Sequence, residues 1–287
     1  MIPKSFDYYA PASLDEAMRL LGEHEEAKVL AGGQSLLPMM KLRLAAPTAL
    51  VDITKLPGLS YVRDEGGHLA IGALITHDAV EHDRTIKERF TAIHDAVVRI
   101  GDQQVRNVGT IGGSACHADP AADLPTALLV LDAQFVIRGR EGPRVVPARD
   151  FFVDVFATAV GHDEILTEIR LAYPPPRSAS AYVKHSLREA DFAIAMVGAA
   201  VTVGDGDVCI DARIGLGSAG PTPLRATSAE QYLGGKVLDD ETIEKAAEMA
   251  VEGADPPSDV HGSREYRQEM IKTLTRRSLK LALSRVK

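Results

Sequence analysis

The stretch TIGGSACHADPAADLP, residues 110–125, packs a glycine pair, a thiol, an imidazole and two carboxylates into one short segment. A second glycine pair occurs in AGGQSLLP, residues 31–38, directly after an apolar run that is typical of a strand. Adjacent glycines allow positive φ and let consecutive N–H groups face one side, which makes a concave anion site. One glycine pair alone is usually a plain turn, but two such loops suit the two phosphates of a diphosphate.

The spacing within these loops excludes the common nucleotide motifs. Neither loop has the GxGxxG pattern of a dinucleotide fold, and neither ends in the Gly-Lys-Ser/Thr of a phosphate loop. Cys116 and His117 have no second ligand pair at zinc spacing, so the sequence predicts no metal site. Covalent attachment of a flavin to Cys116 or His117 is the less favoured alternative to a buried thiol. Cys209 is the other cysteine, and two thiolates cannot ligate an iron–sulfur cluster, which needs about four.

Two aspartates follow the second glycine pair. If a helix begins at Pro120, Asp119 is its natural N-cap and Asp123 lies in its first turn. Because Asp119 then already has a partner, Asp123 is the better candidate to accept hydrogen bonds from hydroxyl groups of a bound ligand. The motif GDGD at residues 204–207 lacks the later glutamate of a calcium loop and predicts a hairpin turn.

Composition limits the class of protein. The 287 residues carry a formal charge of −8, the wrong sign for nucleic-acid binding. No segment approaches the ~20 apolar residues that span a bilayer, and the first residues do not read as a signal peptide. We therefore expect a protein that does not span a membrane and stays in the cytoplasm, free or at the inner face of the membrane.

The pattern of elements predicts an α+β fold in two domains. Helices are expected at 14–21, ended by Gly22, near 84–98 and 124–132, and near 228–233, 240–252 and 263–285. Strands are expected at 28–31, 49–53, 68–71 and 134–138, and a hairpin of 192–203 with 208–210 precedes a third strand at 213–216. The stiff YPPPR at 173–177 cannot pair in a central strand and predicts the domain boundary.

Three segments together identify a resemblance. The residues AGGQSLLPMMKLRL at 31–44, QVRNVGTIGGSACHADPAADLP at 104–125 and DVHGSREYR at 259–267 resemble the FAD-binding medium subunits of molybdenum hydroxylases, the xanthine oxidase family. The resemblance runs over essentially the whole chain. Within that family the chain looks most like the medium subunit of aerobic carbon monoxide dehydrogenase. Medium subunits of nicotine, xanthine and other N-heterocycle dehydrogenases are close behind.

The resemblance implies a fold. It is a PCMH-type FAD-binding domain of the vanillyl-alcohol-oxidase type over residues 1–173, with subdomains of about 1–56 and 57–173. A C-terminal domain of the carbon monoxide dehydrogenase flavoprotein type, with three antiparallel strands and three helices, would follow at 177–287.

The resemblance also implies which residues hold non-covalent FAD. No catalytic residue is expected, and the cofactor-binding residues are Val29, Leu30, Ala31, Gly32, Gly33, Gln34, Ser35, Leu36, Ile100, Thr110, Ile111, Gly112, Gly113, Ser114, Asp123, Leu166 and Lys184. Ser114 departs from the Asn of many relatives, but its hydroxyl can still donate to a phosphate. Lys184 would stabilise reduced flavin if it lies near the ring, and is otherwise an ordinary solvated lysine. Phe192 either covers one face of the isoalloxazine or is a core phenylalanine.

The function that the resemblance implies is electron transfer within a complex. A small subunit would supply [2Fe–2S] clusters, a large subunit would carry the molybdenum cofactor, and the assembly would be a dimer of heterotrimers. Electrons would pass through FAD to a quinone or another acceptor. The rival interpretations are a stand-alone flavin oxidoreductase, for which 287 residues leave little room, and a non-enzymatic nucleotide-binding module. Nothing in the chain names the reducing substrate.

Overall fold

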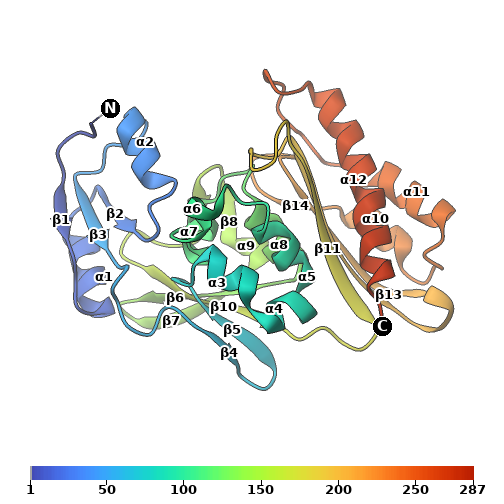
Figure 1. The fold of residues 1–287 in the computed structure, drawn as a ribbon, viewed down its shortest axis with the longest axis horizontal. Helices are drawn as coiled ribbons and strands as arrows, with labels where there is room; N and C mark the ends of the chain where they lie inside the picture. The colour runs from blue at the N-terminus through green and yellow to red at the C-terminus, as the bar shows by residue number, and fades with distance from the viewer. Residues whose placement is uncertain (1) are drawn as a thin grey trace.

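The computed structural model describes residues 2–287 as three layers that follow one another along the chain (Figure 1). The N-terminal layer is a parallel sheet in the order β1-β3-β2, with strands β1 (Asp7–Tyr9), β2 (Ala27–Leu30) and β3 (Ala49–Asp52). Helix α1 (Leu14–Glu23) is capped by Ser13 and buries one face against this sheet. Helix α2 (Leu36–Leu42) follows β2 after the first glycine pair.

The middle layer is an antiparallel sheet with helices on one side. Its strand order is β4-β5-β10-β6-β7. The strands are β4 (Val62–Asp64), β5 (His68–Gly72), β6 (Gln134–Gly139), β7 (Gly142–Pro147) and β10 (Ile165–Ala172). The helices are α3 (His77–His82), α4 (Arg84–Arg89), α5 (Thr91–Val97), α6 (Gln103–Arg106), α7 (Ile111–His117), α8 (Asp123–Val130) and α9 (Ala148–Phe151). A small hairpin, β8 (Phe152–Asp154) with β9 (Ala157–Thr158), follows α9.

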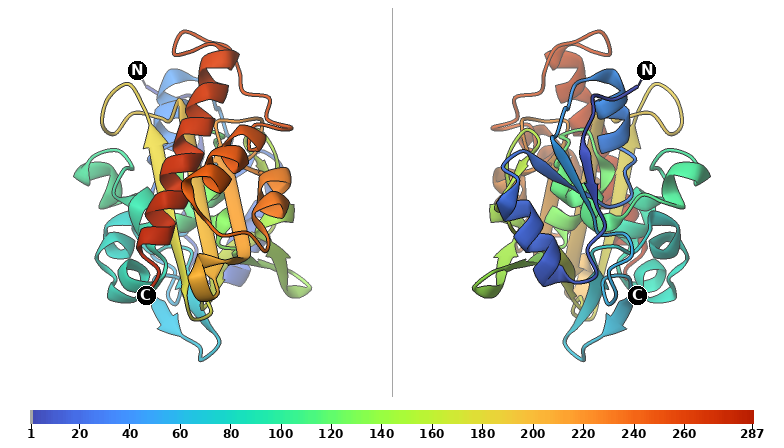
Figure 2. Two further views of the ribbon diagram at one scale, coloured as in Figure 1. Left: turned by 90° about the vertical axis from the view of Figure 1, so that its right-hand side faces the viewer. Right: turned by 90° about the vertical axis from the view of Figure 1, so that its left-hand side faces the viewer.

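The C-terminal layer is a four-stranded antiparallel sheet covered by three helices. Its order is β11-β12-β13-β14, with β11 (Ser178–His185), β12 (Ala195–Val203), β13 (Cys209–Gly217) and the two-residue β14 (Leu224–Arg225). Helices α10 (Thr227–Leu233), α11 (Asp240–Met249) and α12 (Arg264–Ser284) lie on its outer face, as Figure 2 shows. Every residue of β12 is buried because helices pack on both of its faces.

The last helix and the middle layer are joined by a partly buried ion pair. The guanidinium of Arg285, just past α12, donates to both carboxylate oxygens of Asp95 on α5, at 2.6 and 3.0 Å. Asp95 also accepts from the backbone N–H of Tyr182, and Arg285 donates to the carbonyl of Ser180. Four contacts therefore fix α5, β11 and the chain end relative to one another.

Several predicted boundaries are wrong, each for a local reason. Gly22 lies inside α1, whose C-cap is His24, and the predicted helix over 84–98 is two helices separated at Phe90. Residues 213–216 continue β13 and do not form a separate strand, since residues 205–207 form a tight 3₁₀ turn, η1 (Asp205–Asp207), that already reverses the chain.

The strand after the proline run was missed altogether. β11 has no strict alternation to signal a strand, because its small and polar residues pack against both α5 and β12. The sheet therefore holds the three expected long strands, with β11 as the first of them, together with the short β14.

Among residues 2–287, no helix has the length and apolar character that a bilayer crossing needs.

Candidate functional site

The first glycine loop, residues 31–35, leads from β2 into α2 and leaves a row of backbone donors free. Gly33 has φ of +70°, which turns the chain sharply at a position where a side chain would be strained. Within residues 2–287, no protein acceptor pairs with the N–H groups of Gly33, Gln34, Ser35 or Leu36. Unpaired amides at the start of a helix carry partial positive charge, so this loop is a ready site for an anion.

The second glycine loop, residues 110–114, is built differently although its sequence looks alike. The N–H of Gly112 donates to the carbonyl of Ala73 at 2.9 Å, and that of Ile111 donates to Ile75. The N–H of Gly113 donates to Oγ1 of Thr110, which caps α7. The amides of this loop are therefore already used by the protein, and the prediction of two equivalent amide sites is correct only for the first loop.

The two loops nevertheless meet, although they are far apart in the sequence. A Cβ added to Gly32 would lie 2.3 Å from the carbonyl oxygen of Val108 and 2.7 Å from the Cα of Gly109. Only a glycine allows this approach of two backbones. The close approach brings the free amides of the first loop and the hydroxyls of Thr110 and Ser114 to the same cavity.

This cavity has a volume of about 780 Å³ and lies between all three layers. Every residue predicted for cofactor binding lines it except Leu30 and Ile111, and Ile111 is fully buried in the middle core. The lining residues among those predicted are Val29, Ala31, Gly32, Gly33, Gln34, Ser35, Leu36, Ile100, Thr110, Gly112, Gly113, Ser114, Asp123, Leu166 and Lys184. The volume is that of a site for a large organic ligand.

A buried ion pair closes one wall of the cavity. Nζ of Lys184 lies 3.0 Å from the carboxylate of Asp123, and the two side chains are 3% and 8% exposed. Nζ also donates to the carbonyl of Arg99, and the hydroxyl of Tyr182 donates to Asp123 at 2.7 Å. Burial raises the pKa of Asp123, while Lys184 and Tyr182 oppose that rise. The alternative of a solvated Lys184 is therefore wrong.

Asp123 reaches this position by a different route from the one predicted. Helix α8 begins at Asp123 and not at Pro120, and its N-cap is Ala122 without a side-chain cap. Asp119 lies before the helix, where its carboxylate accepts from the N–H of Ala121. The expected cap role of Asp119 is wrong because residues 119–122 form a turn first.

Four further residues line the cavity that were not predicted to bind the cofactor: His77, Cys116, His117 and Phe156. Burial raises the pKa of the Cys116 thiol to about 12, so this thiol stays protonated and is a poor nucleophile. His117 packs on the ring of Phe156, and burial lowers its pKa. His77 is 4% exposed, and its Nδ1 has no partner within residues 2–287. Cys116 and His117 were considered only for metal binding and covalent attachment, and no local signal pointed to His77 or Phe156.

Phe192 is 70% exposed, so the interpretation as a core phenylalanine is wrong. It lines both the main cavity and a second one of about 710 Å³, which the C-terminal layer forms with the segment after α7. Asp119 and Asp191 are also shared by the two cavities. The main cavity is therefore bordered by an exposed aromatic side chain, beyond which lies further open space.

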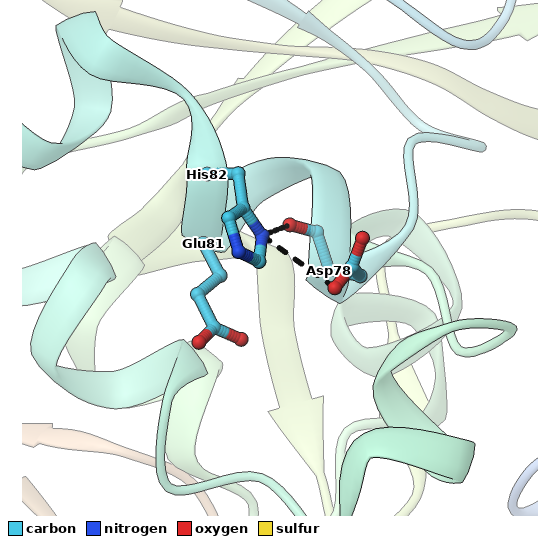
Figure 3. Close-up of side chains that lie close together, drawn as sticks. All are labelled: Asp78, Glu81 and His82. Carbon is cyan, nitrogen blue, oxygen red and sulfur yellow. Dashed lines mark hydrogen bonds and ion pairs between the residues drawn. The ribbon is translucent and has the colours of Figure 1, made fainter.

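One group of possible metal ligands lies outside the cavity, on α3. Asp78, Glu81 and His82 bring their ligand atoms within 4.8 Å of one another, as Figure 3 shows. Each already has a partner: Glu81 pairs with Arg106 at 2.8 Å, Asp78 accepts from Gln103, and His82 Nδ1 bonds the carbonyl of Asp78. These contacts account for the cluster as ordinary helix and ion-pair chemistry.

Comparison with known proteins gives the site its context. Residues 4–174 match the family described as "FAD binding domain in molybdopterin dehydrogenase", and residues 180–282 match "CO dehydrogenase flavoprotein C-terminal domain". The carbon monoxide dehydrogenase medium chain of Afipia carboxidovorans is 38% identical over the full length of both chains. The 6-hydroxypseudooxynicotine dehydrogenase complex subunit alpha of Paenarthrobacter nicotinovorans is also 38% identical, covering all of this chain and 97% of that one.

The solved structures agree with the sequences. The carbon monoxide dehydrogenase of Hydrogenophaga pseudoflava superposes with a TM-score of 0.97 at 38% identity, and the match covers all of both chains. The expected fold class is thereby confirmed, and so is the expectation of FAD in this chain with the molybdenum cofactor and iron–sulfur clusters in other subunits. By sequence and by fold, the chain belongs to the FAD-binding medium subunits of the molybdenum hydroxylases, which are oxidoreductase complexes of several subunits.

Proposed function

We propose that the 780 Å³ cavity is the FAD site and that the first glycine loop binds the diphosphate. The observation that carries this proposal is the row of free amides from Gly33 to Leu36, which faces the same cavity as Thr110 and Ser114. A diphosphate needs several donors close together. Glycine at 32 lets this loop approach the backbone of Val108, and glycine at 33 allows the φ of +70° that turns the free amides to one side.

The other predicted residues take the remaining parts of the cofactor in this proposal. Asp123 accepts hydrogen bonds from FAD hydroxyl groups, while Ile100, Leu166 and Lys184 line the flavin. Leu30 and Ile111 support the loops from behind, since neither lines the cavity. The thiol of Cys116 stays protonated, which supports non-covalent binding. The two families matched by the chain meet between residues 174 and 180, which supports the domain division of 1–173 and 177–287. The separate sheets β1-β3-β2 and β4-β5-β10-β6-β7 support the subdomains of about 1–56 and 57–173.

When bound, FAD takes electrons from iron–sulfur clusters and delivers them in pairs to an acceptor. The chain's own part is to hold the flavin, exclude water from it and set the charge around it, for which no acid or base residue is required. We propose a quinone as the acceptor and a dimer of heterotrimers as the assembly, in the cytoplasm or at the inner face of the membrane. The space beyond Phe192 gives an acceptor a route toward the flavin.

Ligand discrimination tests the proposed FAD site. The purified full chain should be yellow, release FAD on mild denaturation, and bind FAD at least about 100-fold more tightly than riboflavin, which lacks phosphate. Equal affinity for FAD and riboflavin would contradict the role of the free amides. A colourless chain that cannot be loaded with FAD would favour the nucleotide-binding module. Turnover of a small reductant by the isolated chain, at the rate of the complex, would favour the stand-alone oxidoreductase.

We propose carbon monoxide as the reducing substrate of the complex. The likeness of the C-terminal domain to the carbon monoxide dehydrogenase flavoproteins supports this choice. The equally similar 6-hydroxypseudooxynicotine relative supports an N-heterocycle or a related compound as the second candidate. Purification of the complex with its large and small subunits, followed by assays with carbon monoxide and with nicotine-type substrates, distinguishes the two.

A further inference from the structure

Tyr182 lies behind the wall of the proposed FAD cavity, and the proposed function gives it no role. It lies on β11, its side chain is 2% exposed, and it belongs to the middle hydrophobic core. Its hydroxyl donates to Oδ1 of Asp123 at 2.7 Å, with the sulfur of Met196 as its other neighbour at 2.9 Å. A buried tyrosine hydroxyl needs such a partner, and a carboxylate is a stronger acceptor than a thioether.

Asp123 is thus held by two donors from one strand. Tyr182 and Lys184 are two residues apart on β11, so they point to the same face of the sheet. The Tyr182 hydroxyl donates to Oδ1 of Asp123 at 2.7 Å, and Nζ of Lys184 lies 3.0 Å from both carboxylate oxygens. Lys184 and Asp123 line the cavity, while Tyr182 does not. The tyrosine can therefore act on a ligand in the cavity only through Asp123.

We propose that Tyr182 is a positioning residue that keeps the Asp123 carboxylate ionised and fixed beside Lys184, and so sets the pH range in which the chain holds FAD. This inference rests on the proposed function, in which Asp123 accepts hydrogen bonds from FAD hydroxyl groups. An ionised carboxylate accepts such bonds strongly, whereas a protonated one presents a donor in their place.

The charges around Asp123 give the sign of the effect. Burial raises the pKa of Asp123, and Lys184, Tyr182 and Arg99 act against that rise. From α7, the cavity wall adds Cys116 and His117, followed by Asp119, and β12 contributes only the neutral sulfur of Met196. Removal of the Tyr182 hydroxyl removes one of the interactions that lower the pKa of Asp123. Asp123 then takes up a proton at a higher pH.

The experiment measures FAD affinity of the full chain against pH, by quenching of flavin fluorescence, from pH 8 down to the acid limit of folding. In the unaltered chain, affinity should fall in acid as Asp123 becomes protonated. Tyr182→Phe keeps the ring, and should move the midpoint of that fall upward by about one pH unit, which makes FAD binding about fivefold weaker at the original midpoint. Asp123→Asn should bind FAD weakly throughout and lose this midpoint.

Tyr61→Phe is a matched control, because Tyr61 also donates to a carboxylate, that of Glu168, and neither residue lines the cavity. It should keep the original profile. His117 and His77 also line the cavity, and burial lowers the pKa of both, so the comparison is repeated with His117→Gln and with His77→Gln present in both proteins.

Two outcomes separate this inference from the proposed function. If Tyr182→Phe weakens FAD binding by the same factor at every pH, or leaves the profile unchanged, Tyr182 has a packing role only and the inference is wrong. If Asp123→Asn binds FAD like the unaltered chain, the assignment of Asp123 in the proposed function fails, and the inference fails with it. Melting temperatures at each pH show whether a variant is folded in the range compared.

Discussion

The two glycine loops look alike in sequence and do different work. The first, at residues 31–35, leaves the amides of Gly33, Gln34 and Ser35 without acceptors in the described part of the chain, residues 2–287. In the second, at residues 110–114, the amide of Gly112 is bonded to Ala73, and that of Gly113 is bonded to Thr110. A glycine pair can thus supply donors to a ligand or allow a helix to pack closely, and only the partners of its N–H groups tell which.

The largest expected effect is a loss of stability in acid, because the buried histidine His77 is bonded to the backbone beside the second loop. The backbone N–H of His77 donates to the carbonyl of Gly109, and burial lowers the pKa of its imidazole to about 4. In the folded chain the imidazole of His77 therefore stays neutral down to about pH 4. In the unfolded chain it takes up a proton below its ordinary pKa of about 6.5. The contribution of neutral His77 to the free energy of unfolding is fully present above pH 6.5. It is lost as the pH falls from 6.5 toward 4, by up to about 3 kcal/mol.

Urea unfolding at pH 7, 5.5 and 4 measures this loss, and His77→Gln should remove most of it. His82→Gln is the control, since the His82 side chain is exposed. An unchanged dependence on pH in His77→Gln would show that another group causes the loss in acid.

Gly112→Ala should damage the second loop through packing. The added Cβ would lie 2.6 Å from both Cβ and the carbonyl oxygen of Ala73, and a backbone neighbour cannot move aside cheaply. Overpacking of this kind costs about 2 to 3 kcal/mol, measured by urea unfolding. Gly67→Ala, at a glycine with nothing within 4 Å, should change stability by less than about 0.5 kcal/mol. Equal effects of the two substitutions would contradict the close contact of α7 with Ala73.

Gly33→Ala tests the first loop, where the reason for glycine is its backbone angle. A φ of +70° costs an alanine about 1 to 2 kcal/mol, and relief of that strain would displace the free amides. We expect FAD affinity to fall about tenfold, as measured by flavin fluorescence. Gly66→Ala carries the same backbone cost at φ of +78° far from the cavity. Gly66→Ala should therefore lower stability about as much as Gly33→Ala does and leave FAD affinity unchanged. An equal loss of FAD affinity in both variants would contradict a direct role of the first loop in FAD binding.

The smallest effects should come from the hydroxyls beside each loop. Thr110→Val removes the bond to the Gly113 N–H and should cost about 1 kcal/mol of stability. Ser35 makes no capping bond at the start of α2, so Ser35→Ala should leave unfolding by urea almost unchanged. It should instead weaken FAD binding severalfold, because in our proposal its hydroxyl donates to the diphosphate. If Thr110→Val instead weakened FAD binding, and Ser35→Ala instead lowered stability, the roles given to the two loops would be wrong.

The location of the site could be predicted from the sequence better than its internal geometry could. Glycine pairs after a strand and at a helix start are local signals, so both loops were found, and the helix expected from residue 14 does begin there, capped by Ser13. Which amides remain free depends on Ala73 and Ile75, whose carbonyls reach the second loop through the connection from β5 to α3. No local pattern carries that information.

The same limit applies to the buried groups of the cavity. Lys184 and Asp123 are far apart in the sequence, and their pairing depends on how α5 packs against both β11 and α8. The helix expected at Pro120 begins later, because the carboxylate of Asp119 turns the chain first by binding the Ala121 N–H. The ion pair therefore lay beyond local reasoning, whereas the turn at Asp119 is a local feature that the predicted helix start overlooked.

The bond between Arg285 and Asp95 has a practical consequence for anyone handling this protein. Removal of Arg285, or reversal of its charge, acts beside α5 and β11. Because Asp95 also holds the backbone of Tyr182, such a change disturbs the strand that carries Lys184 although Arg285 does not line the cavity. Preparations in which flavin content is compared should therefore keep this ion pair intact.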